Sequence, residues 1–197
     1  MKSKLFASLL AATVIATTGF TASADSSYEH IRNATGKLTY NDTTFLIDPF
    51  FAAENSFPGF EGTFNSQQRV PLVDLPKSVN EILNDVDAVV VTHTHPDHWD
   101  EAAAKSINKD TPIFVQNASD QALIQSQGFK DVRVLSDTAT FEGVTLSHRN
   151  ATHGTDAMYQ NKQAADLLGE TMGVVFTMPN EKICLHHGGH RLDSGYY

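Results

Sequence analysis

Residues 89–100 read VVVTHTHPDHWD and place three histidines and two aspartates directly after an apolar run. The valines are typical of a short strand that is buried on both faces. His93, His95, Asp97 and His98 then follow in the pattern H-x-H-x-D-H. Imidazole and carboxylate groups are ligands that Zn²⁺ and similar divalent cations accept, and a turn after a strand can direct them into one pocket. The pattern favours a metal site over its alternative, a polar loop that is satisfied by water.

The segments around this motif predict a layered α/β fold. Strands and helices alternate in the first part of the chain and strands dominate later, which indicates sheets with helices on the outside. We expect a helix from Ser78 to Leu83 with Ser78 as its cap, a helix capped by Asp100, and a helix that begins at Asn117 or Ser119 and ends at Gly128. The expected strands are 31–40, 43–47, 88–91, 112–116, 132–135, 140–141, 144–148 and 173–178.

Residues 50–64 carry five phenylalanines, with Pro58, Gly59 and Gly62 among them. Such an aromatic loop either packs onto the core or forms one wall of a substrate pocket. We favour packing onto the core, and the pocket wall stays as the alternative.

The motif THTHPDHWD resembles the signature of the metallo-β-lactamase-fold hydrolases. LIDPFF at 46–51 and HGTDAMY at 153–159 are similar to the branch that contains ascorbate-phosphate-lactonase-like proteins. The resemblance covers residues from about 31 to 182 and implies an αββα sandwich with metal held at the sheet edges between its two halves. It implies that His93 and His95 join a later histidine on a first metal ion, and that Asp97 and His98 serve a second. Zinc is the default cofactor, and Mn²⁺ or iron accepts the same ligand types.

Two residues compete to be the later histidine. His148 lies within a predicted strand, whereas His153 precedes Gly154, which allows close approach of the backbone. In the family that this sequence resembles, this ligand directly precedes a glycine. We therefore choose His153 and leave His148 as a strand residue or a residue that supports the ligands. His30, alone near the start of the expected domain, reads as a surface histidine.

The expected chemistry is hydrolysis by a metal-bound hydroxide, because a bound metal ion lowers the pKa of water from 15.7 toward about 7. Asp97 is the one residue that we expect to be catalytic, by orienting the nucleophile and carrying a proton to the leaving group. The resemblance implies a small-molecule substrate such as a lactone, an ester or a phosphoester. The alternative is a non-catalytic or inactive metal-binding fragment that lacks the second half of a two-metal site.

The first 24 residues are expected to be a signal peptide, because Lys2 and Lys4 precede the apolar run 5–20 and the small residues 22–24. The remaining residues 25–197 then form one domain in the periplasm or outside the cell. The net charge is −9 for the whole chain and −11 without the two lysines. Such an acidic protein is a poor partner for nucleic acid or for an anionic membrane surface. Cys184 is the single cysteine, so the chain cannot form an internal disulfide.

The end of the sequence departs from the resembling family, whose members continue with a Gly-Asp-Thr motif that supplies a bridging aspartate. Residues 183–197 read ICLHHGGHRLDSGYY instead. One permitted codon set for residues 185–192, read one base later, encodes Tyr-Ile-Thr-Gly-Asp-Thr-Val-Trp. We therefore expect a frameshifted tail at about 183–197, an incomplete second half of the sandwich, and accidental residues at Cys184, His186, His187 and His190. The alternative is that HHGGH is a genuine metal-binding tail.

Overall fold

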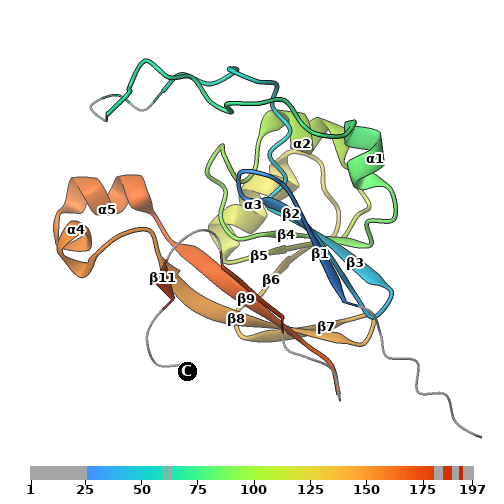
Figure 1. Ribbon diagram of the computed structural model, residues 1–197. Coiled ribbons are helices and arrows are strands. Elements are labelled where there is room, and N and C mark those ends of the chain that lie inside the picture. The colour runs from blue at the N-terminus through green and yellow to red at the C-terminus, as the bar shows by residue number, and fades with distance from the viewer. Residues whose placement is uncertain (1–25, 60, 62–63, 180–183, 188–190, 193–197) are drawn as a thin grey trace, which may run out of the picture.

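Two β-sheets face each other in the computed structural model, which describes residues 26–59, 61, 64–179, 184–187 and 191–192 (Figure 1). The first sheet has the strand order β1-β2-β3-β4-β5-β6. Its first three strands are antiparallel and the last three add to β3 in parallel. The strands are β1 (Ser27–Arg32), β2 (Thr35–Tyr40), β3 (Thr43–Ile47), β4 (Ala88–Val91), β5 (Ile113–Val115) and β6 (Val132–Val134).

The second sheet has the order β10-β9-β8-β11, and β7 also pairs with β8. All of these pairings are antiparallel. The strands are β7 (Thr138–Phe141), β8 (Val144–Thr152), β9 (Thr171–Thr177), β10 (Cys184–His187) and β11 (Arg191–Leu192). The long antiparallel pair of β8 and β9 forms the centre of this sheet.

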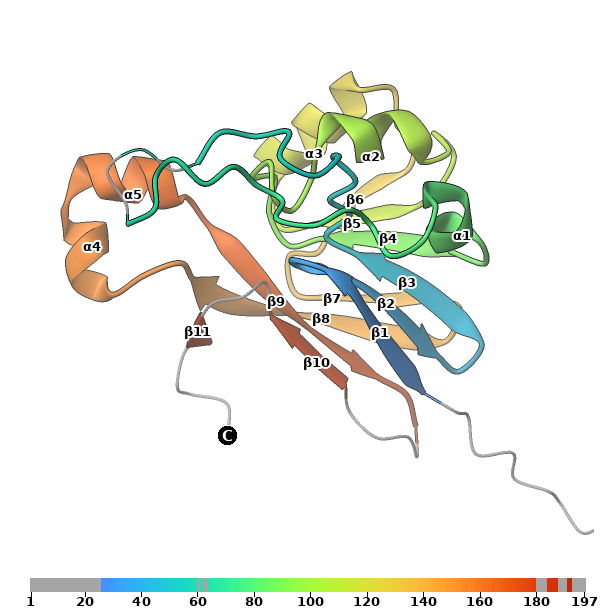
Figure 2. The same ribbon diagram turned by 45° about the horizontal axis from the view of Figure 1, so that its top comes forward.

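Three helices cover the outer face of the first sheet, and two more lie beyond one end of the second sheet (Figures 1 and 2). The helices are α1 (Val79–Leu83), α2 (Glu101–Ser106), α3 (Ala118–Ser126), α4 (Asp156–Gln160) and α5 (Lys162–Leu168). None of the helices among the described residues is long and apolar enough to cross a bilayer. The layered mixed α/β architecture that the sequence predicts is confirmed.

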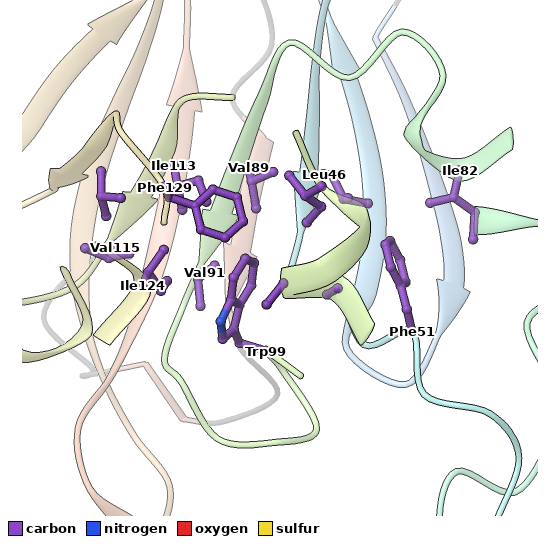
Figure 3. Packing of buried hydrophobic residues seen from close by; sticks show 14 of the residues in the cluster. Leu46, Phe51, Ile82, Val89, Val91, Trp99, Ile113, Val115, Ile124 and Phe129 are labelled. Atoms are coloured by element: carbon purple, nitrogen blue, oxygen red, sulfur yellow. The ribbon is translucent and has the colours of Figure 1, made fainter. Parts of the chain in front are cut away.

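Strand β4 explains how the layers are held together, because its side chains alternate between two apolar cores. Val89 and Val91 point toward the helices and pack with Trp99 and Ile124 (Figure 3). Val90 points the other way, into the core between the two sheets. All four residues of β4 are fully buried, as expected for a strand that is covered on both faces. The histidine motif therefore begins at the end of a rigid central strand.

The helix starts are set by three caps that the sequence predicts correctly. The Ser78 side chain accepts from the backbone N–H of Glu81 in a capping box at α1. Asp100 accepts from the N–H of Ala103 at α2, and Asn117 caps α3. A second role of Asp100 was not predicted: its other carboxylate oxygen accepts from the backbone N–H groups of residues 51 and 52. One side chain thus ties the end of the motif to the segment that follows β3.

Two sequence predictions about the first strands are wrong or incomplete. Residues 31–40 do not form one strand, because the chain turns at Asn33, whose φ of 52° lies in the left-handed region that asparagine tolerates. The result is an additional hairpin between β1 and β2. Strand β8 continues to Thr152, beyond the predicted end at residue 148. This extension carries the chain to the position directly before His153.

The aromatic segment 50–64 packs onto the core only in part. Phe50 and Phe51 are 1% and 5% exposed, so the start of the segment packs onto the core as expected. The guanidinium of Arg32 donates to the carbonyls of Phe50 and Ala52 and fixes this start. Phe64, in contrast, is 95% exposed. Packing of the aromatic loop onto the core is therefore confirmed for its first residues and wrong for Phe64.

The expected signal peptide, residues 1–24, lies outside the described residues, as do parts of the expected tail. Within that tail the backbone of β10 pairs with β9, with Cys184 opposite Phe176 and His187 opposite Gly173. The frameshift hypothesis stays a prediction.

Candidate metal centre

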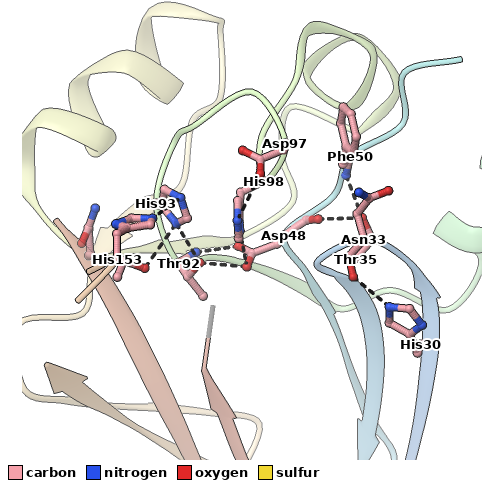
Figure 4. A network of polar contacts seen from close by, with 12 residues as sticks. His30, Asn33, Thr35, Asp48, Phe50, Thr92, His93, Asp97, His98 and His153 are labelled. Atoms are coloured by element: carbon pink, nitrogen blue, oxygen red, sulfur yellow. Dashed lines mark hydrogen bonds and ion pairs between the residues drawn. The ribbon is translucent and has the colours of Figure 1, made fainter. Parts of the chain in front are cut away.

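Three histidines from distant parts of the chain converge at one end of the two sheets. The ligand-type ring nitrogens of His93, His95 and His153 all lie within 4.8 Å of one another. His93 and His95 follow β4 in the loop that leads to α2, and His153 follows β8 of the opposite sheet. The Nε2 atoms of His93 and His153 are 3.0 Å apart (Figure 4). The cluster therefore spans the junction between the two halves of the fold.

Of the two histidines that the sequence offered as a third partner, the structure places His153 in this cluster. His148 lies within β8, opposite Val174 of β9, and lines a cavity next to the cluster. His30 is exposed and contacts the carbonyl of Asn33, as expected for a surface histidine.

The spacing of the three imidazoles fits a divalent cation. Two nitrogens bound at 2.0–2.1 Å to a tetrahedral Zn²⁺ ion are separated by about 3.4 Å. The 3.0 Å between His93 and His153 is close to that separation. The rings of His93 and His95 are 4.6 Å apart and nearly perpendicular, with an interplanar angle of 81°. The three ligand-type nitrogens lie within 4.8 Å of one another, and three imidazoles are a donor set that zinc accepts.

Hydroxyl groups fix the orientation of the His93 ring. The Oγ1 atoms of Thr92 and Thr171 each lie 3.2 Å from His93 Nδ1. Thr171 begins β9, so His93 is held from both sheets at once. With Nδ1 engaged in this way, Nε2 faces His153 and is the atom available to a metal ion. Contacts of this kind orient a ligating imidazole and set its tautomer.

Asp48 is a central residue that the sequence analysis did not single out. It follows β3 and is fully buried, at 0% exposed. It accepts from the backbone N–H and the hydroxyl of Thr92, at 2.7 and 2.8 Å, and contacts His98 Nδ1 at 2.9 Å (Figure 4). A buried carboxylate is stabilised when several donors surround it. Asp48 lies in the segment LIDPFF, which sequence reasoning connected with a family without giving its aspartate a role.

His98 and Asp97 lie beside the three-histidine cluster. The ring of His98 packs against that of His93, with centroids 3.9 Å apart, and His98 Nε2 is 3.8 Å from an Asp97 carboxylate oxygen. Burial opposes protonation of His98, but the hydrogen bond and charge of Asp48, together with the charge of Asp97, outweigh it and raise the pKa of His98 above its usual value. The Asp97 side chain is 49% exposed, so it can reach a ligand in solvent.

Tyr159 of α4 and Gly169, which follows α5, form one wall of the cluster. The backbone N–H of His153 donates to the Tyr159 hydroxyl at 3.1 Å, and that hydroxyl donates to the carbonyl of Gly169 at 3.0 Å. A Cβ atom at Gly169 would lie 3.7 Å from Nε2 of His95. Tyr159 thus connects the segments next to His153 and His95. It ends the segment HGTDAMY, but sequence reasoning gave it no role, because the local sequence does not show which groups its hydroxyl contacts.

A cavity of about 400 Å³ adjoins this wall. Most of its lining residues carry a polar side chain, and none of the described ones is a lysine or an arginine. The lining residues are Gln116, His148, Asn150, Ala151, Thr152, Tyr159, Gly169, Glu170 and Thr171.

The comparison with known protein families agrees with this geometry. Residues 29–194 match the family model described as a β-lactamase superfamily domain. The chain belongs to this superfamily. The resemblance inferred from residues 89–100 is therefore confirmed, and the sandwich of two sheets with histidines at their junction is the metallo-β-lactamase fold.

Two solved structures of the metallo-β-lactamase fold are similar to this protein. The crystal structure of a "possible metal-dependent hydrolase" from Veillonella parvula has 56% sequence identity and a TM-score of 0.80, and the match covers 81% of this chain and 61% of that one. An isothiocyanate hydrolase from Delia radicum gut bacteria has 45% identity and a TM-score of 0.76, with 80% and 60% of the two chains covered.

A curated relative gives the same result. The UPF0173 protein YddR of Bacillus subtilis (strain 168) is 39% identical over 153 residues, which is 78% of this chain and 58% of that protein. The chain thus spans about three fifths of the length of each of these three relatives.

Proposed function

We propose that this protein is a metal-dependent hydrolase in which His93, His95 and His153 bind one divalent cation, Zn²⁺ by default. The observation that carries the proposal is the convergence of three imidazoles from two sheets, with ring nitrogens within 4.8 Å of one another. The hydrolase names of two relatives with at least 45% identity support it. Asp97 and His98, which adjoin the cluster, are the proposed ligands of a second cation.

A bound divalent cation would supply Lewis acidity and lower the pKa of a coordinated water toward about 7. The protein's own residues would do the rest. Asp48 and the hydroxyls of Thr92 and Thr171 would hold the imidazoles in place. Asp97, with its half-exposed side chain, would orient water and carry a proton to the leaving group.

We propose that the substrate is a small, uncharged electrophile that is attacked at carbon, such as a lactone, an ester or an isothiocyanate. The relative named isothiocyanate hydrolase supports this class. For an isothiocyanate, addition of water across the N=C=S carbon followed by C–N cleavage gives an amine and carbonyl sulfide. Phosphoesters are less favoured, because the described lining of the adjoining cavity includes Glu170 and neither a lysine nor an arginine that would bind a phosphate.

The deciding experiment is elemental analysis of the purified full chain, followed by parallel assays with an isothiocyanate, a lactone and a phosphodiester. The proposal expects bound metal, hydrolysis of at least one of the carbon substrates, loss of activity after chelation and recovery when zinc is returned. Metal binding without any turnover would favour the alternative, an inactive metal-binding fragment. His95→Ala should lose the metal, and an unchanged metal content in that variant would refute the assignment of the cluster.

We also propose export to the periplasm or beyond, supported by Lys2, Lys4 and the apolar run at 5–20. Sequencing the N-terminus of protein recovered from the periplasm tests it. A first residue near 25 would support export, and an intact Met1 in the cytoplasm would contradict it.

A further inference from the structure

We propose that Asp120 is a positioning residue for the histidine cluster, because its buried carboxylate holds Thr94, the residue between His93 and His95. The inference rests on the proposed function of that cluster as a metal site. Neither Asp120 nor Thr94 belongs to the set of residues that would touch the cation.

The contact between the two side chains is short and direct. The Thr94 hydroxyl donates to Asp120 Oδ1 at 2.6 Å. Asp120 lies in the first turn of α3 and is 7% exposed. Thr94 lies between His93 and His95 in the chain, so a fixed Thr94 restricts the backbone that carries both imidazoles. A carboxylate on α3 thereby sets the aim of two imidazoles on the loop after β4.

The second carboxylate oxygen of Asp120 connects the same unit to the opposite sheet. Gln116 Nε2 donates to Asp120 Oδ2 at 2.9 Å and to the carbonyl of Glu170 at 3.0 Å. Glu170 lies between Gly169, which adjoins His95, and Thr171, whose hydroxyl contacts His93. Asp120 therefore joins the segments on either side of the cluster, one from each half of the fold.

The role of Asp120 in α3 does not account for this arrangement. The cap of that helix is Asn117, which accepts from the backbone N–H of Asp120. Burial of a carboxylate costs free energy unless donors compensate, and no lysine or arginine pairs with Asp120 among the described residues. The helix N-terminus and two side-chain donors offset that cost. An apolar residue would fill the same position without the free-energy cost of burying a charge. The carboxylate of Asp120 therefore indicates a function in the site.

The test measures zinc affinity of the full chain by competition with a chromophoric chelator, for the wild type and four variants. Asp120→Asn keeps the shape, but its amide cannot accept from both Thr94 and Gln116. Thr94→Val removes the hydroxyl and keeps the branched shape, whereas Thr94→Ser restores the hydroxyl. Glu101→Gln is the matched control, because Glu101 is also an acid in the first turn of a helix and is exposed.

We expect Asp120→Asn and Thr94→Val each to weaken zinc binding by about 10- to 100-fold, the usual effect of losing a residue that supports a metal ligand. Thr94→Ser and Glu101→Gln should bind like the wild type. The double variant Asp120→Asn/Thr94→Val should bind zinc no more weakly than the weaker of the two single variants, because both substitutions break the same hydrogen bond. The absorption spectrum of bound Co²⁺ should shift in the two weakened variants, which reports ligand geometry directly.

Equal zinc affinity in the wild type, Asp120→Asn and Thr94→Val would overturn the inference and leave the proposed metal site standing. A wild type that binds no zinc would refute the proposed function, and this inference with it. If Asp120→Asn fails to fold, the pair Thr94→Val and Thr94→Ser decides. If Thr94→Ser binds zinc as weakly as Thr94→Val, that result also contradicts the inference.

Discussion

The Nε2 atoms of His93 and His153 lie 3.0 Å apart although sixty positions separate the two residues in sequence. One follows a parallel strand of the first sheet and the other an antiparallel strand of the second. The two sheets pack against each other through the apolar core between them, so this contact depends on how they dock. The proposed cation would therefore connect the two halves of the domain.

His153→Ala is expected to abolish stoichiometric zinc binding. Loss of a residue that only supports a ligand costs 10- to 100-fold in affinity, so loss of a ligand should cost more than about 100-fold. His148→Ala, in the same strand region, is the control and should keep its zinc. Metal content after gel filtration in zinc-free buffer measures both. The reverse outcome, with zinc lost from His148→Ala only, would show that the wrong histidine was chosen.

Removal of the metal should lower thermal stability, because the cation would bind only the docked arrangement of the sheets. Zinc at 100 times its Kd would stabilise the fold by about 2.7 kcal/mol. For a domain of this size that corresponds to a fall in Tm of about 5–11 °C after chelation. Calorimetry before and after treatment with a chelator measures it. The shift should disappear in His95→Ala, and an equal shift there would mean that the chelator acts elsewhere.

Asp48→Asn is expected to lower the pKa of His98 in the metal-free protein to below its ordinary value of about 6.5. Burial disfavours the imidazolium of His98. In the wild type, the hydrogen bond and charge of Asp48, together with the charge of Asp97, outweigh burial and raise the pKa of His98. The stabilising ion pair of the wild type is thus fully present below pH 6.5 and is lost as the pH rises through the higher folded pKa of His98. NMR titration of the imidazole C–H signals measures both proteins. An unchanged pKa would mean that Asp48 does not control this ring.

Tyr159→Phe should weaken zinc binding by about 10-fold and destabilise the protein by about 1–2 kcal/mol. The variant loses the single hydroxyl that connects the N–H of His153 to the carbonyl of Gly169, and each such hydrogen bond contributes about 0.5–1.5 kcal/mol. Denaturant titration and chelator competition give the two values. Tyr28→Phe is the control, since Tyr28 is 46% exposed and lies on β1. Wild-type zinc affinity in Tyr159→Phe would remove this tyrosine from the site.

The parts of the fold that the sequence predicts best are those with a local physical cause. Four consecutive buried residues fix β4, and the caps Ser78, Asp100 and Asn117 fix three helix starts. The turn at Asn33 was missed because asparagine in a run of strand-forming residues gives only a weak signal for a left-handed conformation.

The candidate site divides in the same way. His93, His95, Asp97 and His98 are close in sequence and their pattern is specific, whereas His153 was chosen by its glycine and by resemblance. Asp48 and Tyr159 lie in the segments LIDPFF and HGTDAMY, but sequence reasoning gave no role to them or to Asp120. Their roles depend on contacts over 44, 26 and 6 positions, which the local sequence does not show.

The division of the cluster between two sheets also has a consequence for biosynthesis. His93 and His95 precede His153 and Thr171 in the chain, so an incomplete chain that ends before β8 offers only two of the three proposed donors. We expect zinc capture to be a late event that follows pairing of β8 with β9, and purified fragments that end before β8 and after β9 would differ in retained zinc. Cation loading would then act as a checkpoint on assembly and not as the nucleus from which folding starts.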